Sequence, residues 1–242
     1  MAQARKSSCV QSSGVPIHQY LPCFNPVLHS KLLRYNETQN FELSTDDYHD
    51  YQTQYLPDRI EKAAIVSKGG YLYYIAYDTL TLVKFHISSN ITVTRRSLIG
   101  NVGKGDTYSY SGGERSSLDL EIDESGLWVI YSTAENQGLL VFSQINTTTL
   151  KIEATWYGHY PKKSVGNCFV ICGTFYCTSS HESHNAKVNY YYNTKTNEEG
   201  FMNVPFDSKY GDIKSIKYNP YEQKLYAWDK GHAVVYDMIF EL

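Results

Sequence analysis

A module of two short apolar runs recurs along this chain at intervals of about 50 residues. In each copy an apolar residue with an aromatic neighbour is followed, about a dozen residues later, by a second apolar run and a polar turn rich in Asn and Thr. The copies begin at Leu72, Leu127, Phe175 and Leu225. This period is typical of a four-stranded blade of a β-propeller, and 242 residues leave room for about five blades. A sandwich of unrelated hairpins is the alternative interpretation.

The second copy contains a predicted β-hairpin over residues 118–131. Its two runs flank the sequence Asp-Glu-Ser-Gly, which suits a tight turn with glycine at a position of positive φ. Leu118, Leu120 and Ile122 should share one face of the first strand, and the nearly continuous apolar run after the turn predicts a strand buried on both faces. Asp119 alternates out of this row, so we expect it to face a different compartment, such as the axis of a closed architecture.

The composition favours one large all-β domain. Hydrophobic residues make up 42% of the chain and aromatic residues 14%, including 23 Tyr, and aromatic and β-branched residues favour strands. A net charge of -3, with Lys and Arg scattered, provides no field for a polyanion, so nucleic acid is not an expected partner. No window approaches ~20 consecutive apolar residues, so the sequence predicts no membrane-spanning helix.

Residues 1–55 differ in amino-acid composition from residues 56–242, which contain the repeated module. They hold several prolines and an acidic, Tyr-rich stretch, and we expect few regular elements there, with one or two strands near 32–35 and 41–43. The first residues lack the apolar core of a signal peptide. We interpret the two parts as one domain, because no linker divides them.

The cysteines leave several interpretations open. An odd number allows at most two disulfides, and the five are Cys9, Cys23, Cys168, Cys172 and Cys177. With His181 and His184, the last three form a cluster of the kind that can hold zinc. Strand residues an odd number of positions apart face opposite ways, however, so Cys172 and Cys177 should diverge, and zinc is disfavoured.

Polar motifs point to surface turns rather than to catalysis. Three sequons for N-glycosylation begin at Asn36, Asn90 and Asn146, as would suit the turns of a secreted chain. The adjacent acids Asp123 and Glu124 fall in the predicted hairpin turn, and we interpret them as solvated charges. The Gly-x-Ser-x-Gly motif of a nucleophilic serine is absent from the sequence.

Several strings, taken in order, resemble the olfactomedin domain family. They are Leu-Pro at 56–57, Gly-Tyr-Leu-Tyr-Tyr at 70–74, Asp-Leu-Glu-Ile-Asp-Glu at 119–124, Gly-Leu-Trp-Val-Ile-Tyr at 126–131, Thr-Trp at 155–156, Asn-Cys-Phe-Val-Ile-Cys-Gly at 167–173, Tyr-Asn-Pro at 218–220 and Tyr-Ala-Trp-Asp at 226–229. The resemblance covers residues 56–242 and fades before them. It implies a five-bladed β-propeller, closed by the N-terminal segment at 1–55.

The resemblance also implies a disulfide between Cys9 and Cys172, which would tie the N-terminal segment to a distant blade. The other three cysteines, Cys23, Cys168 and Cys177, would be free or paired in a way that the family does not predict, and we expect Cys168 to be unpaired. In the chain-entropy model a bond that closes so long a loop stabilises a domain by up to ~5 kcal/mol.

A calcium ion in the propeller channel is the third implication of the resemblance. The family's ligand positions correspond to Asp119, Asn167, Cys168, Ile216 and Lys217. Asn167 and Cys168 begin the string at 167–173, and Ile216 and Lys217 directly precede Tyr-Asn-Pro. Lysine departs from the family pattern, because the family has Asp at that position. An ammonium group has three donors and no acceptor, so we expect Lys217 to take the place of the cation and to pair with Asp119 and the Asn167 amide oxygen. The alternative is that Lys217 points to solvent and a different ion, such as sodium, remains.

For function, the resemblance implies a non-enzymatic extracellular module for protein–protein interaction and cell adhesion or matrix binding, in a secreted, disulfide-bonded glycoprotein. Since no signal peptide is found, we interpret the chain as a domain of a longer protein whose oligomerising segments lie elsewhere. The alternative is a five-bladed propeller glycoside hydrolase or a carbohydrate-binding protein. A hydrolase needs two carboxylates about 5 to 9.5 Å apart in an open cleft, and the resemblance places only Asp119 near the axis.

Overall fold

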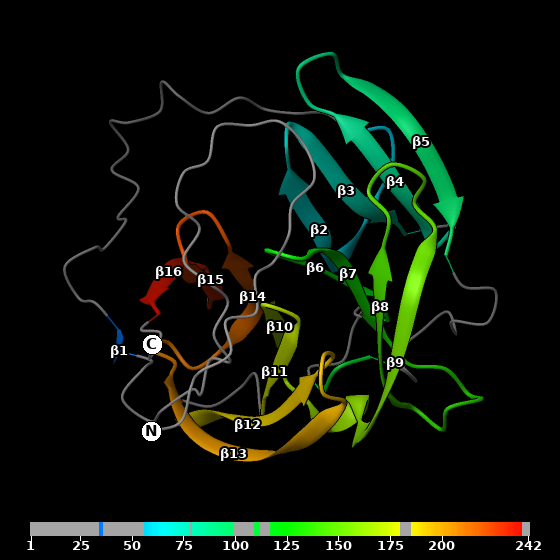
Figure 1. Cartoon of the computed structure of the whole chain (residues 1–242). Helices are drawn as coiled ribbons and strands as arrows, with labels where there is room; N and C mark the ends of the chain where they lie inside the picture. Colours follow the sequence, from blue (N-terminus) through cyan, green and yellow to red (C-terminus); the bar gives the residue numbers. More distant parts are fainter. Residues whose placement is uncertain are drawn as a thin grey trace, which may run out of the picture.

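Four antiparallel sheets of four strands are arranged around a common centre (Figure 1). The computed structural model describes residues 34–35, 56–77, 79–98, 109–111, 117–179 and 185–238. The predicted strand near 41–43 and the cysteines Cys9 and Cys23 lie outside these ranges. The expected all-β, propeller-like architecture is confirmed, and the described residues contain four blades, one fewer than predicted.

Each sheet follows the chain from its inner to its outer edge, except that β1 completes the last one by pairing with β16. The sheets are β2-β3-β4-β5, β6-β7-β8-β9, β10-β11-β12-β13 and β14-β15-β16-β1. The strands are β1 (Arg34–Tyr35), β2 (Ile60–Lys68), β3 (Tyr71–Ala76), β4 (Thr81–His86), β5 (Ile91–Ser97), β6 (Asp119–Asp123), β7 (Gly126–Tyr131), β8 (Leu139–Ile145), β9 (Ile152–Pro161), β10 (Cys168–Ile171), β11 (Thr174–Thr178), β12 (Asn185–Asn193), β13 (Glu198–Asp207), β14 (Ile213–Asn219), β15 (Lys224–Asp229) and β16 (His232–Asp237). A 3-10 turn, Lys162–Ser164, follows β9.

The sequence repeat corresponds to the middle of each sheet. In every copy the first apolar run lies on the second strand of a sheet, and the second run lies on the third strand. Asn side chains form the polar turns that follow: Asn146 Oδ1 accepts the backbone N–H groups of Thr148 and Thr149, each at 2.9 Å. Asn193 makes the same kind of turn after β12. These side-chain hydrogen bonds add to the backbone bonds of the same turns, in which Asn146 O accepts from Leu150 N and Asn193 O from Asn197 N, each at 2.8 Å.

The predicted hairpin forms as β6 and β7, with Asp123 opposite Gly126. Gly126 has φ +148°, a conformation that side chains rarely adopt, as the turn sequence indicated. All of β7 after Gly126 is buried, because its residues alternate between two cores. Leu127 and Val129 face the sheet β2–β5, whereas Trp128 and Ile130 face the sheet β10–β13.

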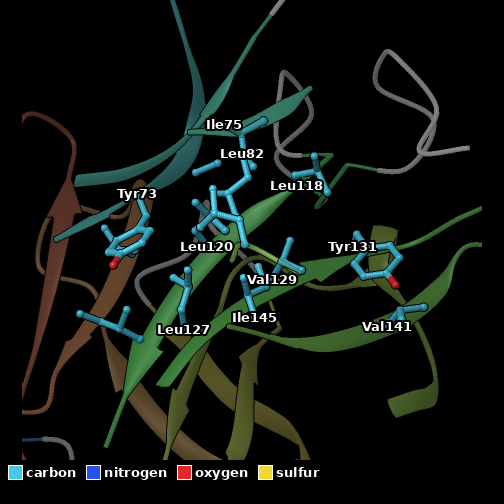
Figure 2. Close-up of a cluster of buried hydrophobic side chains, with 14 residues drawn as sticks. Tyr73, Ile75, Leu82, Leu118, Leu120, Leu127, Val129, Tyr131, Val141 and Ile145 are labelled. Carbon is cyan, nitrogen blue, oxygen red and sulfur yellow. The ribbon is translucent and has the colours of Figure 1, made fainter. Parts of the chain in front are cut away.

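Side chains from consecutive sheets form the cores between them. Figure 2 shows the first, in which Leu120 and Leu127 lie with Tyr73, Ile75 and Leu82 of the preceding sheet. In the second, Phe175 stacks on Phe142 with ring centroids 4.1 Å apart and meets Trp128 edge-on at 5.2 Å. The third joins the sheet β10–β13 to the last sheet and contains Phe169, Tyr176, Ile216, Leu225 and Tyr236. The described blades therefore pack face to face around the centre.

The disulfide prediction for Cys168 is wrong. Cys168 and Cys177 are bonded to each other, with an S–S distance of 2.05 Å. They stand directly opposite in the β10–β11 hairpin, where facing Cβ atoms are close enough for a disulfide. Zinc binds cysteine as the thiolate, and both sulfurs are joined in the disulfide, so neither is available to zinc. The pairing of Cys9 with Cys172 stays a prediction, because Cys9 lies outside the described residues.

Candidate functional site

The inner strands β6, β10 and β14 bring the predicted ion-site residues to the centre of the propeller (Figure 1). Asp119 begins β6, Cys168 begins β10, and Ile216 and Lys217 lie within β14. Asn167 directly precedes β10 and is buried. Each sheet contributes its inner edge, so residues about 50 to 100 positions apart in sequence meet here.

The Lys217 ammonium group occupies this centre, and its three donors all have partners. Its Nζ donates to Asp119 Oδ1 at 2.6 Å, to the Leu120 carbonyl at 2.7 Å and to Glu121 Oε1 at 2.5 Å. The predicted pairing of Lys217 with Asp119 is therefore present. The expected bond to Asn167 is not among these contacts: Leu120 and Glu121 take its place, and Asn167 Oδ1 accepts the backbone N–H of Cys168 at 3.1 Å.

The second oxygen of Asp119 is also engaged. Tyr110 donates its hydroxyl to Asp119 Oδ2 at 2.9 Å. The ammonium of Lys162 lies 4.1 Å from the centre of the Tyr110 ring, in a cation–π contact, and Lys162 is fully buried. Two buried carboxylates, Asp119 and Glu121, thus lie in one network with two ammonium groups.

Burial and charge act in opposite directions on this network. Burial alone would lower the pKa of Lys217, but the charges of Asp119 and Glu121 and their hydrogen bonds raise it above its ordinary value. Burial raises the pKa of Glu121 well above its ordinary value, Lys217 counteracts this in part, and Asp119 adds to it. Lys217 therefore carries its full charge at neutral pH.

The arrangement does not fit a calcium ion. Calcium takes 6 to 8 oxygen ligands, and here the oxygens of Asp119 and the amide oxygen of Asn167 already accept hydrogen bonds. The position of the fifth expected ligand holds an ammonium group, which repels cations. Within the described ranges, no three His, Cys, Asp or Glu side chains are grouped so as to hold a metal ion.

Sequence reasoning missed three members of this network: Glu121, Tyr110 and Lys162. Glu121 could have been found, because residues two apart on a strand share a face, and Asp119 was already expected to point to the axis. Its Oε2 is buried, and no described residue hydrogen-bonds to it. Tyr110 and Lys162 carry no such signal, since they lie outside the strands and reach the centre through the tertiary structure.

The interpretation of Asp123 and Glu124 as solvated charges is wrong. Asp123 is fully buried, and its Oδ2 accepts the backbone N–H of Gly173 in the β10–β11 turn at 2.6 Å. Glu124 accepts the Tyr218 hydroxyl at 2.7 Å and the backbone N–H of Cys172 at 3.1 Å. The turn after β6 thus packs against two other sheets, which the local sequence does not indicate.

The sequons have different surroundings. Asn90 is exposed in the turn between β4 and β5, where its φ is +56°. Asn146 is partly buried, and its Nδ2, the atom that would carry a glycan, donates to Glu153 Oε1 at 2.8 Å. Asn36 lies outside the described residues. Glycosylation at all three stays a prediction.

Comparison with known proteins decides the family. The model of the olfactomedin-like domain matches residues 20–242. The chain belongs to the olfactomedin-like domain family. This olfactomedin-like chain is 39% identical to human myocilin over 183 residues, which are 76% of the chain and 36% of myocilin. Rat myocilin is 35% identical over 208 residues, 86% of the chain and 40% of the relative.

The olfactomedin-like chain therefore spans less than half of the curated relatives that it matches. Among solved structures, the β-propeller domain of Cps50 (Swd1) from Myceliophteria thermophila matches with a TM-score of 0.40 and 11% identity, over 73% of this chain and 53% of that one. Within the described residues, no helix is long and apolar enough to cross a membrane.

Proposed function

We propose that this chain is a non-enzymatic, extracellular protein-interaction module of the olfactomedin type. Family membership is the observation that carries the proposal. The geometry of the centre supports it, because Asp119 and Glu121 are buried and share one ammonium group. A glycosidase needs an acid and a second carboxylate presented to the sugar in an open cleft. Nothing in the comparisons favours glycoside hydrolysis or sugar binding.

The outer strands β9 and β13 carry the surface that we assign to a partner. Tyr157 on β9 is 63% exposed and Phe201 on β13 is 73% exposed. The Phe201 ring also packs edge-on against Tyr160, with centroids 5.3 Å apart, so it is held in place by a neighbouring sheet. Rigid, exposed aromatic residues are enriched among the residues that contribute most to protein–protein binding.

Binding to a panel of purified extracellular and cell-surface proteins tests the proposal. We expect the domain to bind at least one, and Tyr157→Ser with Phe201→Ser to weaken that binding at least tenfold. The matched control is Tyr221→Ser, since Tyr221 is 70% exposed in the turn between β14 and β15. Hydrolysis of glycosides that Asp119→Asn abolishes, with no protein bound, would overturn the proposal.

We also infer that the complete propeller has five blades, one more than the described residues contain. The inference is supported by β15, whose Tyr226 and Trp228 are 37% and 48% exposed, although β7 and β11 are buried on both faces. This exposed face borders a cleft of about 560 Å³ between the last sheet and β2–β5, which extends inward to Glu121 on β6 and to Lys217. A fifth blade between the last sheet and β2–β5 would cover the exposed face of β15 and fill the cleft, so it accounts for both features.

A further inference from the structure

We infer that the Lys217 ammonium does the structural work of a metal ion at the propeller centre, so the domain folds and keeps its stability without calcium. The first ground is position: Lys217 Nζ contacts two carboxylate oxygens and a carbonyl oxygen, all within 2.7 Å. Such oxygens are the ligands that a hard cation prefers. An ammonium makes the same contacts through directional hydrogen bonds.

The second ground is charge. Asp119 and Glu121 place two acidic side chains in the interior, where a carboxylate charge without a cation beside it is costly. Lys217 contacts both carboxylates, and the buried Lys162 lies over the ring of Tyr110, which itself donates to Asp119. Lys217 is thus shared directly by the two acidic side chains, and Lys162 reaches them only through Tyr110. A divalent ion at this point would be repelled by the ammonium of Lys217.

The third ground is connection. Asp119 on β6 and Lys217 on β14 lie 98 positions apart, and their ion pair joins the inner edges of two sheets. A bound ion can also join two sheets, but the fraction of molecules that hold the ion depends on its free concentration and its affinity. A lysine side chain is covalently attached, so its link does not depend on the composition of the medium.

Thermal unfolding in different ions tests this inference. The wild-type chain should have the same Tm in calcium and in chelator, and also when sodium is replaced by choline at constant ionic strength. Calorimetric titration with calcium should give no binding heat at the centre. A Tm that rises with calcium or sodium, and no longer does so in Asp119→Asn, would overturn the inference.

Substitutions at position 217 supply the second test. Lys217→Met leaves two buried carboxylates without their cation and should lower the Tm by roughly 10 °C. The matched control is Lys214→Met on the same strand, whose lysine is 54% exposed and pairs with Asp212, and the Tm should change by no more than about 2 °C. Equal effects of the two variants would contradict the inference.

Lys217→Asp should create a calcium site, which the wild type lacks. The new aspartate would lie beside Asp119 and Glu121, so three carboxylates would surround the centre. Calcium should then raise the Tm of this variant, and the effect should disappear when Lys217→Asp is combined with Asp119→Asn.

If Lys217→Met fails to fold, a triple variant that adds Asp119→Asn and Glu121→Gln removes the buried charges. It should fold, and its Tm should not change with calcium. A calcium requirement in that variant would show that the ion binds elsewhere and stabilises the fold.

Discussion

Asp123 shows how one buried carboxylate connects several parts of the chain. Its Oδ1 accepts hydrogen bonds from Ser125 N at 2.9 Å, Gly126 N at 3.0 Å and Trp128 Nε1 at 2.8 Å. Its Oδ2 reaches Gly173 in the next sheet. Hydrogen bonds to charged groups are stronger than neutral ones, so this residue fixes both the hairpin turn and the contact between sheets.

Replacing Asp123 by Asn should be strongly destabilising. The amide group would direct N–H donors at the existing donors, and the charge-assisted bonds would be lost, at a cost of about 3 kcal/mol. In a domain of this size the Tm should fall by roughly 6–12 °C. The control is Glu153→Gln, which keeps an acceptor for Asn146 at an exposed position. A Tm for Asp123→Asn within the range of this control would contradict the role assigned to Asp123.

The disulfide between Cys168 and Cys177 can be tested at the same scale. Peptide mapping of unreduced, folded protein should recover the fragments that contain these two cysteines as a linked pair. In the chain-entropy model, a disulfide between residues 9 positions apart stabilises the fold by about 2–3 kcal/mol. The variant with both Cys168→Ala and Cys177→Ala should therefore unfold at a lower urea concentration. Recovery of Cys177 as a free thiol would refute the pairing. The same maps test the Cys9–Cys172 prediction.

At the scale of elements, Glu199 links the outer strands of two sheets. It lies on β13 and accepts hydrogen bonds from the Tyr190 hydroxyl and from the backbone N–H of His159 on β9 at 3.0 Å, and its other oxygen contacts the His159 ring. Gly158 allows this approach, since a Cβ there would stand 2.7 Å from the Tyr190 hydroxyl. Burial alone would raise the pKa of Glu199, but the hydrogen bonds from Tyr190 and His159 lower it below its ordinary value.

This lowered pKa predicts the pH dependence of the link. A carboxylate with a lowered pKa in the folded state stabilises the fold above its ordinary pKa of 4.5, and this contribution is lost as the pH falls through the lowered value. Glu199→Gln should therefore cost about 1–2 kcal/mol at pH 7 and progressively less below about pH 4. Urea unfolding at several pH values measures this loss of unfolding free energy. The control is Glu198→Gln, at a neighbouring exposed position. A cost that stays constant with pH would contradict the mechanism.

At the scale of the whole molecule, the uncovered face of β15 makes the fifth blade testable. Trp228 lies on this face, whereas Trp128 is buried and Trp156 is partly buried. If a fifth blade covers Trp228, acrylamide should quench the folded protein weakly, and Trp228→Phe should leave the quenchable fraction unchanged. A quenchable fraction that disappears in Trp228→Phe, with Trp156→Phe as control, would show that the face is open to solvent.

The sequence by itself determined the strands, the four-strand period and the family. These features depend on local patterns: alternation gives the strand, glycine with positive φ gives the turn, and each repeat contains the same module. Leu127 and Trp128 show this directly, because adjacent residues on a strand must face opposite sides. The family resemblance also predicted the pairing of Asp119 with Lys217, because it places a lysine where the family has an acidic ion ligand.

Only the tertiary structure decided which polar groups are buried and what they contact. Asp123 lies in a turn that resembles any exposed turn until Gly173, 50 positions later, packs against it. Cys168 and Cys177 meet because the β10–β11 turn sets their register, which the family resemblance did not indicate. Tyr110 and Lys162 lie outside the strands and join the centre only through the tertiary structure. Burial depends on chain segments that are remote in sequence, and local patterns do not record which of these will cover a given face.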